Sequence, residues 1–157
     1  MSARFKRPVS VLVVIHTPDL QVLLLERAKH PGFWQSVTGS LETEETPLNA
    51  AHREVTEETG LDARAYELSD WQQTHRYKIL DEWRHRYAPE NDYNTEHVFS
   101  LCLPRPLPVR LSVAEHRSSL WQPCQTAAAS CFSWSNRDSI LALPQRMGIA
   151  AGLKALT

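Results

Sequence analysis

Residues 46–60 carry the start and stop signals of one complete helix, and this helix restricts how the rest of the chain can pack. Thr46 is a favourable N-cap residue, and Pro47 follows it at the first helical position, where no backbone N–H is needed. Gly60 stands where helices commonly end in a left-handed residue. The sequence therefore predicts a helix over residues 46–59.

Three carboxylates on this helix are placed unfavourably. Glu54, Glu57 and Glu58 are spaced i, i+3 and i+4, so they fall on one helix face. Like charges at these spacings repel, and Glu57 and Glu58 also meet the negative end of the helix dipole. A bound divalent cation would turn each repulsion into an attraction, and hard cations such as Mg²⁺ prefer oxygen ligands. The ordinary alternative is an acidic helix face in solvent.

The residues around the helix complete a longer pattern. Over residues 39–61 it reads Gly-x5-Glu-x7-Arg-Glu-aliphatic-x-Glu-Glu-x-Gly-aliphatic, and every specified position is satisfied. At average residue usage, a chance match in this chain has odds of about 10⁻⁷. The segment resembles the Nudix box, the signature of hydrolases that cleave nucleoside diphosphates linked to another moiety. Two departures, Ser40 and Glu44 in place of common glycines, are expected to stiffen the loop.

The resemblance to the Nudix family implies a fold and a cofactor. The fold is of the α/β (α+β) class, an α/β/α sandwich with a mixed β-sheet and a loop–helix–loop box over residues 39–61. The whole chain, residues 1–157, is expected to form a single domain, in keeping with its length. The implied cofactor is Mg²⁺, with Mn²⁺ as a possible substitute, bound to the helix.

The same resemblance assigns roles to individual carboxylates. Glu54 and Glu58 match the family's principal metal ligands, and Glu57 matches a further ligand or a general base. A carboxylate from outside the box matches Glu115, which makes Glu57 and Glu115 the catalytic candidates. Glu45 and Arg53 are expected to hold these carboxylates in place, because an arginine can bind carboxylates with a two-pronged fork.

Five further segments narrow the resemblance to the bacterial dihydroneopterin triphosphate diphosphatases of this family. They are residues 6–15, 33–39, 84–89, 94–96 and 133–137. The implied reaction is Mg²⁺-dependent hydrolysis of a small-molecule triphosphate, dihydroneopterin triphosphate, to the monophosphate and pyrophosphate. The positions that match the substrate site of this group are Lys6, Arg27, Thr38, Tyr77, Lys78, Ile79, Leu80 and Ser133.

Two other functions stay open at this point. A pyrophosphohydrolase of the nucleotide pool would act on dATP or other (d)NTPs, since a base and a pterin are both flat heterocycles. A catalytically silent binding module would be expected to lose box carboxylates, and all are present here.

Several side chains outside the box are candidates for binding an anionic, aromatic substrate. Residues 84–86 add cations, unless they form a solvated polar stretch. Thr38 could donate its hydroxyl beside the box, and Trp34 or Tyr77 could stack on a heterocycle, although buried packing is the more ordinary role for Trp34. His116 is adjacent to Glu115.

Charge and cysteine content exclude several function classes. The net charge of −1 gives no bulk attraction to nucleic acid or to an anionic membrane. The apolar run after Pro8 is too short for a membrane span or a signal peptide. Cys102, Cys124 and Cys131 lack paired metal-binding spacing and are typical of reduced thiols in a cytoplasmic protein. A monomer is compatible with the sequence, which leaves the oligomeric state open.

The remaining chain reads as strands with a few helices, which favours a mixed sheet covered on two faces. The continuous β-branched run at residues 9–15 is typical of a buried central strand, with residues 22–25 as its antiparallel partner. Extended segments are predicted at residues 63–69, 71–80, 95–103 and 119–122, and helices at residues 124–131 and 136–147.

Overall fold

The strand predicted at residues 9–15 is the centre of the sheet. The structure, a computed structural model, describes residues 5–148, so residues 1–4 and 149–157 of the expected domain lie outside the described residues. Its elements are β1 (Val9–His16), β2 (Gln21–Arg27), β3 (Trp34–Gln35), β4 (Val37–Ser40), α1 (Pro47–Thr59), η1 (Ala63–Ala65), β5 (Glu67–Lys78), η2 (Asp81–Arg86), β6 (Tyr93–Cys102), β7 (His116–Pro123), α2 (Cys124–Ser130) and α3 (Trp134–Arg146). β1 is buried almost throughout, as its apolar run predicts.

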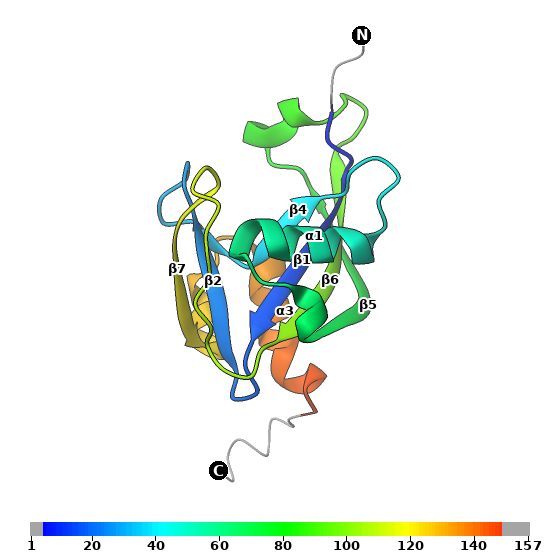
Figure 1. Cartoon of the computed structure of the whole chain (residues 1–157). Coiled ribbons are helices and arrows are strands. Elements are labelled where there is room, and N and C mark those ends of the chain that lie inside the picture. The colour runs from blue at the N-terminus through cyan, green and yellow to red at the C-terminus, as the bar shows by residue number, and fades with distance from the viewer. Residues whose placement is uncertain (1–4, 149–157) are drawn as a thin grey trace.

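The sheet is mixed, and it divides beside β1. β1 runs parallel to β6 along its whole length and antiparallel to β4 from Ser10 to Val13. β2 meets β1 at its far end, where His16 pairs with Val22, and then follows β7 along most of its own length. The predicted antiparallel pairing of β1 with β2 is therefore confirmed at that end. Because β4 occupies the other end of β1, the two strands diverge there (Figure 1).

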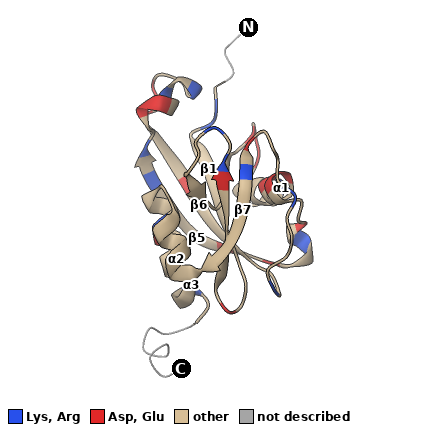
Figure 2. Cartoon of the chain, turned by 90° about the vertical axis from the view of Figure 1, so that its left-hand side faces the viewer, with Lys and Arg blue, Asp and Glu red and all other residues tan. Residues whose placement is uncertain are grey.

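Both faces of the sheet are covered by helices, which confirms the expected sandwich. Val11, Val13 and Ile15 of β1 face a hydrophobic cluster that includes α1 residues such as Val55. Alternate residues such as Val14 face a second cluster that contains residues of α2 and α3. Figure 2 shows the sheet between α1 on one side and the α2–α3 pair on the other. No helix within residues 5–148 is long and apolar enough to span a membrane.

The helix α1 begins and ends at the residues that the sequence indicates. The Thr46 hydroxyl accepts a hydrogen bond of 3.2 Å from the backbone N–H of Asn49, and Pro47 is the first helical residue. Gly60 has φ 75° and donates its N–H to the Thr56 carbonyl, which ends the helix in a left-handed residue. These caps fix the helical register that places the box carboxylates.

Two predictions after α1 were partly wrong. Residues 63–65 form the 3₁₀ turn η1 rather than an extended segment, because Asp62 caps it through its side chain. The two segments expected at 63–69 and 71–80 are one long strand, β5, which pairs with β6. The register of β5 with β6 shifts between Asp70 and Thr74, and Gln72 within this stretch has φ 52°. This irregularity interrupts the alternation of residues along the strand, so the sequence pattern there suggests two strands instead of one. The polar stretch at 81–86 forms the 3₁₀ helix η2.

His16 gives the fold a pH dependence that can be measured. The side chain is 1% exposed, and burial lowers the pKa of His16 below its ordinary value of 6.5. The unfolded chain therefore binds a proton before the folded one as the pH falls through about 6.5, and stability decreases below that pH. We expect His16→Asn to reduce the slope of unfolding free energy against pH, by at most about 1.4 kcal/mol per pH unit.

Urea unfolding of both proteins at pH 7.5, 6.5 and 5.5 measures this slope. The variant His85→Asn, at an exposed position, controls for the substitution itself. Equal slopes for wild type and His16→Asn would contradict the assignment.

Candidate active site

A cleft of about 780 Å³ opens where β1 and β2 diverge, and it collects nearly every residue that the sequence singled out. The predicted metal and catalytic residues that line it are Glu54, Glu57, Glu58 and Glu115. The predicted substrate residues that line it are Lys6, Arg27, Thr38, Tyr77, Lys78, Ile79, Leu80 and Ser133. Of the two predicted supporting residues, Arg53 lines the cleft and Glu45 binds Arg53.

The α1 carboxylates differ sharply in exposure. Glu54 is 7% exposed and Glu58 is 1% exposed, whereas Glu57 is exposed to solvent. Burial, together with the neighbouring carboxylates, raises the pKa of both Glu54 and Glu58. The charge of Glu115, in the loop before β7, contributes to both shifts. The two buried carboxyls thus lie where negative charge is only partly compensated, because burial and the neighbouring carboxylates outweigh the effect of Arg53 on Glu54.

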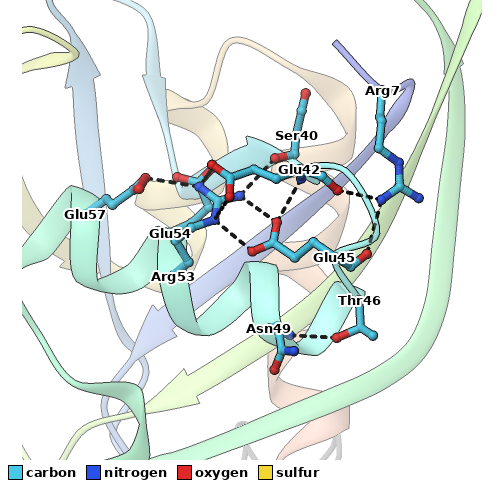
Figure 3. Close-up of polar contacts among 9 residues, drawn as sticks. All are labelled: Arg7, Ser40, Glu42, Glu45, Thr46, Asn49, Arg53, Glu54 and Glu57. Atoms are coloured by element: carbon cyan, nitrogen blue, oxygen red, sulfur yellow. Dashed lines mark hydrogen bonds and ion pairs between the residues drawn. The ribbon is translucent and has the colours of Figure 1, made fainter.

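Arg53 holds this acidic face together (Figure 3). Its Nε and Nη2 donate to the two carboxylate oxygens of Glu45, each at 2.8 Å, and its Nη1 donates to Glu54 at 3.2 Å and to Glu57 at 3.1 Å. Nη2 also donates to the Ser40 carbonyl at 3.1 Å. Glu45 and the other carboxylates raise the pKa of Arg53 still further above its ordinary range. The predicted fork is present in the structure, and it joins the loop before α1 to the helix.

Gly39 lets α1 lie against β4. A Cβ atom at Gly39 would stand 1.7 Å from Oε2 of Glu54, so a side chain here would displace the carboxylate. The two departures from the family pattern behave differently. Ser40 contributes its carbonyl to Arg53, whereas Glu44 adopts φ 62°, a left-handed conformation that favours glycine. Of these two positions, Glu44 is therefore the one where the backbone is strained, and the expected stiffening of the loop stays a prediction.

The carboxylate pair fits a hard divalent cation by its chemistry. Oε1 of Glu58 is buried and has no hydrogen-bond partner in the described part of the chain. The available donors are carboxylate oxygens, which Mg²⁺ and Mn²⁺ favour. Within residues 5–148 no three His, Cys, Asp or Glu side chains are already gathered as a closed metal site. This is compatible with Mg²⁺, which is usually held by one or two carboxylates together with water and substrate phosphates.

A basic group faces the acidic one across the cleft. Burial and the charge of Arg86 lower the pKa of Lys6 and of Arg27. Nε of Arg27 is buried and has no hydrogen-bond partner among the described residues. Cations that repel one another in a partly buried cleft form a suitable site for a polyanion. Of the predicted segment 84–86, Arg86 lines the cleft, whereas Arg84 donates to the Pro89 carbonyl at 2.7 Å.

The structure shows what the Thr38 hydroxyl and the Trp34 ring contact. The Thr38 hydroxyl donates to the Val11 carbonyl at 2.8 Å, so it is not available as a donor to a substrate. Its backbone N–H instead hydrogen-bonds Glu58. Trp34 does not line the cleft and packs against the hydrophobic cluster under α2 and α3, which is the ordinary role expected for it.

His116 lies closer to the acidic site than the sequence indicates. Its Nε2 is 3.8 Å from Oε1 of Glu58 and 3.4 Å from the amide nitrogen of Gln35. Burial, followed by the charge of Arg27, lowers the pKa of His116 to about 4. His116 is therefore neutral near pH 7 and supplies no charge to Glu58.

At the end of the cleft away from the α1 carboxylates, several lining side chains had no role predicted from the sequence. The polar members of this end, Ser10, Asn94 and Glu96, lie on β1 and β6, and its aromatic members Trp83, Phe132 and Trp134 come from segments far apart in the sequence. The segments 6–15, 94–96 and 133–137 contain Ser10, Asn94, Glu96 and Trp134, but the resemblance assigned no role to these four side chains. The available signal was strand alternation, since Asn94 and Glu96 occupy inward positions of β6 where apolar residues are expected.

Known proteins resemble this chain in sequence and fold over most of its length. The dihydroneopterin triphosphate diphosphatase of Escherichia coli (strain K12) is 47% identical over 139 residues, which is 87% of this chain and 91% of that protein. The dihydroneopterin triphosphate diphosphatase of Haemophilus influenzae is 36% identical over 141 residues, 87% of each chain.

A solved structure confirms the architecture. The E. coli dihydroneopterin triphosphate pyrophosphohydrolase superimposes with a TM-score of 0.83 at 44% identity, covering 94% of this chain and all of that one. The family model of the NUDIX domain matches residues 6–143. The box over residues 39–61 and the cleft built around it lie within this match, and the chain belongs to the Nudix family.

Proposed function

We propose that this chain hydrolyses dihydroneopterin triphosphate to dihydroneopterin monophosphate and pyrophosphate, and that it does so as a single Mg²⁺-dependent domain. One observation carries the proposal: a single cleft joins the buried carboxylates of α1, a group of cations and a polar, aromatic end. These three parts match the parts of the substrate: the carboxylates suit a metal ion, the cations suit the triphosphate, and the polar, aromatic end suits the heterocycle. The relatives in E. coli and H. influenzae carry the name of this activity.

Nudix hydrolases generally use a divalent metal, and the fit of the carboxylates supports Mg²⁺ here. Glu54 and Glu58 would hold the ion, with Glu57 and Glu115 as further carboxylates at the rim of the same cleft. A bound divalent cation lowers the pKa of a coordinated water and neutralises phosphate charge.

The protein side chains then position the substrate. Lys6, Arg27 and Arg86 bind the phosphate chain, because their charges converge without full compensation inside the cleft. Glu57 or Glu115 accepts the proton of the attacking water, since both are exposed carboxylates beside the buried pair. Arg53 already binds Glu57 through a hydrogen bond of 3.1 Å, whereas Glu115 lies in the loop before β7.

The reaction is tested with purified protein and three separate substrates: dihydroneopterin triphosphate, dATP and 8-oxo-dGTP. We expect Mg²⁺-dependent release of pyrophosphate, with the highest kcat/KM for the pterin. Orthophosphate as the sole product would contradict the cleavage position. A higher kcat/KM for dATP would favour the nucleotide-pool function, and no turnover of any substrate would favour a silent binding module.

Substitution of Glu58 separates metal binding from folding. In Glu58→Gln we expect kcat/KM to fall about 10³-fold, because a bound metal supplies several kcal/mol of charge stabilisation. The metal-free variant should unfold at a higher temperature than the wild type, since one of two facing buried carboxyls has lost its charge. Calorimetric titration with Mn²⁺ and thermal unfolding measure both effects.

Glu44→Gln, in the exposed part of the same loop, is the matched control. Mn²⁺ affinity and activity unchanged in Glu58→Gln would refute the metal site.

Substitution of Arg53 tests the support of the acidic face. Lysine keeps the charge but cannot make the two-pronged contact with Glu45 while also reaching Glu54 and Glu57. We expect Arg53→Lys to lose about 1–2 kcal/mol of stability and about 10- to 100-fold in kcat, with a smaller change in KM. Urea unfolding and steady-state kinetics measure this, and a change confined to KM would contradict a positioning role.

A further inference from the structure

The end of the cleft away from the α1 carboxylates contains a buried polar cluster, formed by Ser10, Asn94 and Glu96. The proposed phosphate and metal binding does not involve this cluster. Glu96 is 2% exposed, Asn94 is 2% exposed and Ser10 is 5% exposed, and all three line the cleft. They lie on β1 and β6, on the strand positions that alternate toward the α3 face, the side opposite α1. A buried carboxylate that faces a cleft on this side of the sheet requires a physical reason.

Hydrogen bonds within the cluster leave acceptors in excess. The Asn94 amide donates to Oγ of Ser10 at 2.8 Å and to the Tyr77 hydroxyl at 3.0 Å. The donors that reach Glu96 are distant: the Tyr77 hydroxyl lies 3.5 Å from Oε2 and Nδ1 of His75 lies 3.5 Å from Oε1. Both contacts are at the outer limit of hydrogen-bond length.

Asn94 has an unused acceptor in the same cluster. Its Oδ1 is buried and has no hydrogen-bond partner among the described residues. A buried carboxylate with two long contacts and an amide oxygen with none are both stabilised by a ligand that brings N–H donors. The cluster is therefore complementary to a donor-rich edge.

We propose that Glu96 is the residue that selects the heterocycle, by accepting two hydrogen bonds from the adjacent ring N–H and 2-amino group of a 2-amino-4-oxopyrimidine ring. This inference rests on the proposed function, which places a triphosphate of a flat heterocycle in the cleft. Pterins and guanine share this pair of donors. Adenine instead presents a ring nitrogen acceptor at the corresponding position, which a carboxylate repels.

Aromatic side chains beside Glu96 fit a flat ring. The ring centroid of Trp134 lies 5.1 Å from that of His75 and 6.3 Å from that of Tyr77, in edge-to-face arrangements. Trp134 is 42% exposed at the cleft and its indole can cover the face of a heterocycle. Glu96 then accepts hydrogen bonds from the edge of the ring, while Trp134 stacks on its face.

The most direct test removes the 2-amino group from the substrate and the carboxylate from Glu96. dGTP carries the 2-amino group and dITP lacks it, so kcat/KM is measured for both substrates with wild type and with Glu96→Gln, which preserves the size of the side chain. We expect wild type to prefer dGTP by about 10- to 100-fold, the effect of one hydrogen bond to a charged group. In Glu96→Gln the ratio of kcat/KM for dGTP to that for dITP should fall close to one. The ratio of kcat/KM for dihydroneopterin triphosphate to that for dATP should fall as well.

Glu67→Gln, at an exposed position at the other end of the β5–β6 pair, is the matched control and should keep the wild-type preference. Equal kcat/KM for dGTP and dITP in wild type overturns the proposal, and this result does not depend on whether the variant folds. An unchanged dGTP preference in Glu96→Gln also overturns it. Higher kcat/KM for dihydroneopterin triphosphate than for dGTP identifies the pterin as the source of the recognised edge.

A binding measurement separates this inference from the proposed reaction. Dihydroneopterin without phosphates is titrated against both proteins, and quenching of tryptophan fluorescence gives the Kd. We expect Glu96→Gln to weaken binding about 10- to 100-fold. If wild type hydrolyses no triphosphate, the proposed function fails, and a Glu96-dependent Kd still supports ring recognition. Equal Kd values overturn it.

Discussion

The contacts of one guanidinium determine how the acidic end of the cleft is built. Arg53 binds Glu45 in the loop, Glu54 and Glu57 on the helix, and the backbone at Ser40 on the preceding strand. These partners come from three consecutive segments, and the carboxylates of two of them, the loop and the helix, would otherwise repel one another. Because one planar cation satisfies all of them, the loop can remain short and the buried carboxyl of Glu54 can face β4.

Local signals in the sequence were sufficient for the helix and for the placement of its three carboxylates on one face. Thr46, Pro47 and Gly60 act through contacts within a few residues, so their effect is visible without a fold. The family pattern then added a sandwich architecture, and with it the placement of Glu115, which no local signal provides. Arg27 and Lys6 line the same cleft, and their role in substrate binding stays a prediction.

Features that depend on pairing between distant strands could not be predicted in this way. The single long strand β5 was divided in two because its irregularity at Gln72 interrupts the alternation. Thr38 was expected to donate to a substrate, but its hydroxyl is used by Val11 on the neighbouring strand. The segment 94–96 was noted only for its resemblance, and the burial of Asn94 and Glu96 was not predicted because a glutamate within a strand is ordinarily a solvent-facing residue.

The two ends of the cleft belong to opposite faces of the sheet, and this arrangement has an evolutionary consequence. The side chains that we propose for bond cleavage include those of α1 on one face, whereas those that we propose for binding the ring belong to β6 and α3 on the other. Among the described residues, no hydrogen bond or ion pair joins the carboxylates of α1 to Asn94, Glu96 or Trp134, so substitutions in one group are expected to leave the other nearly intact. A protein built in this way can acquire a new substrate by exchanging a few residues on β6, while the machinery that breaks the phosphate bond is inherited unchanged.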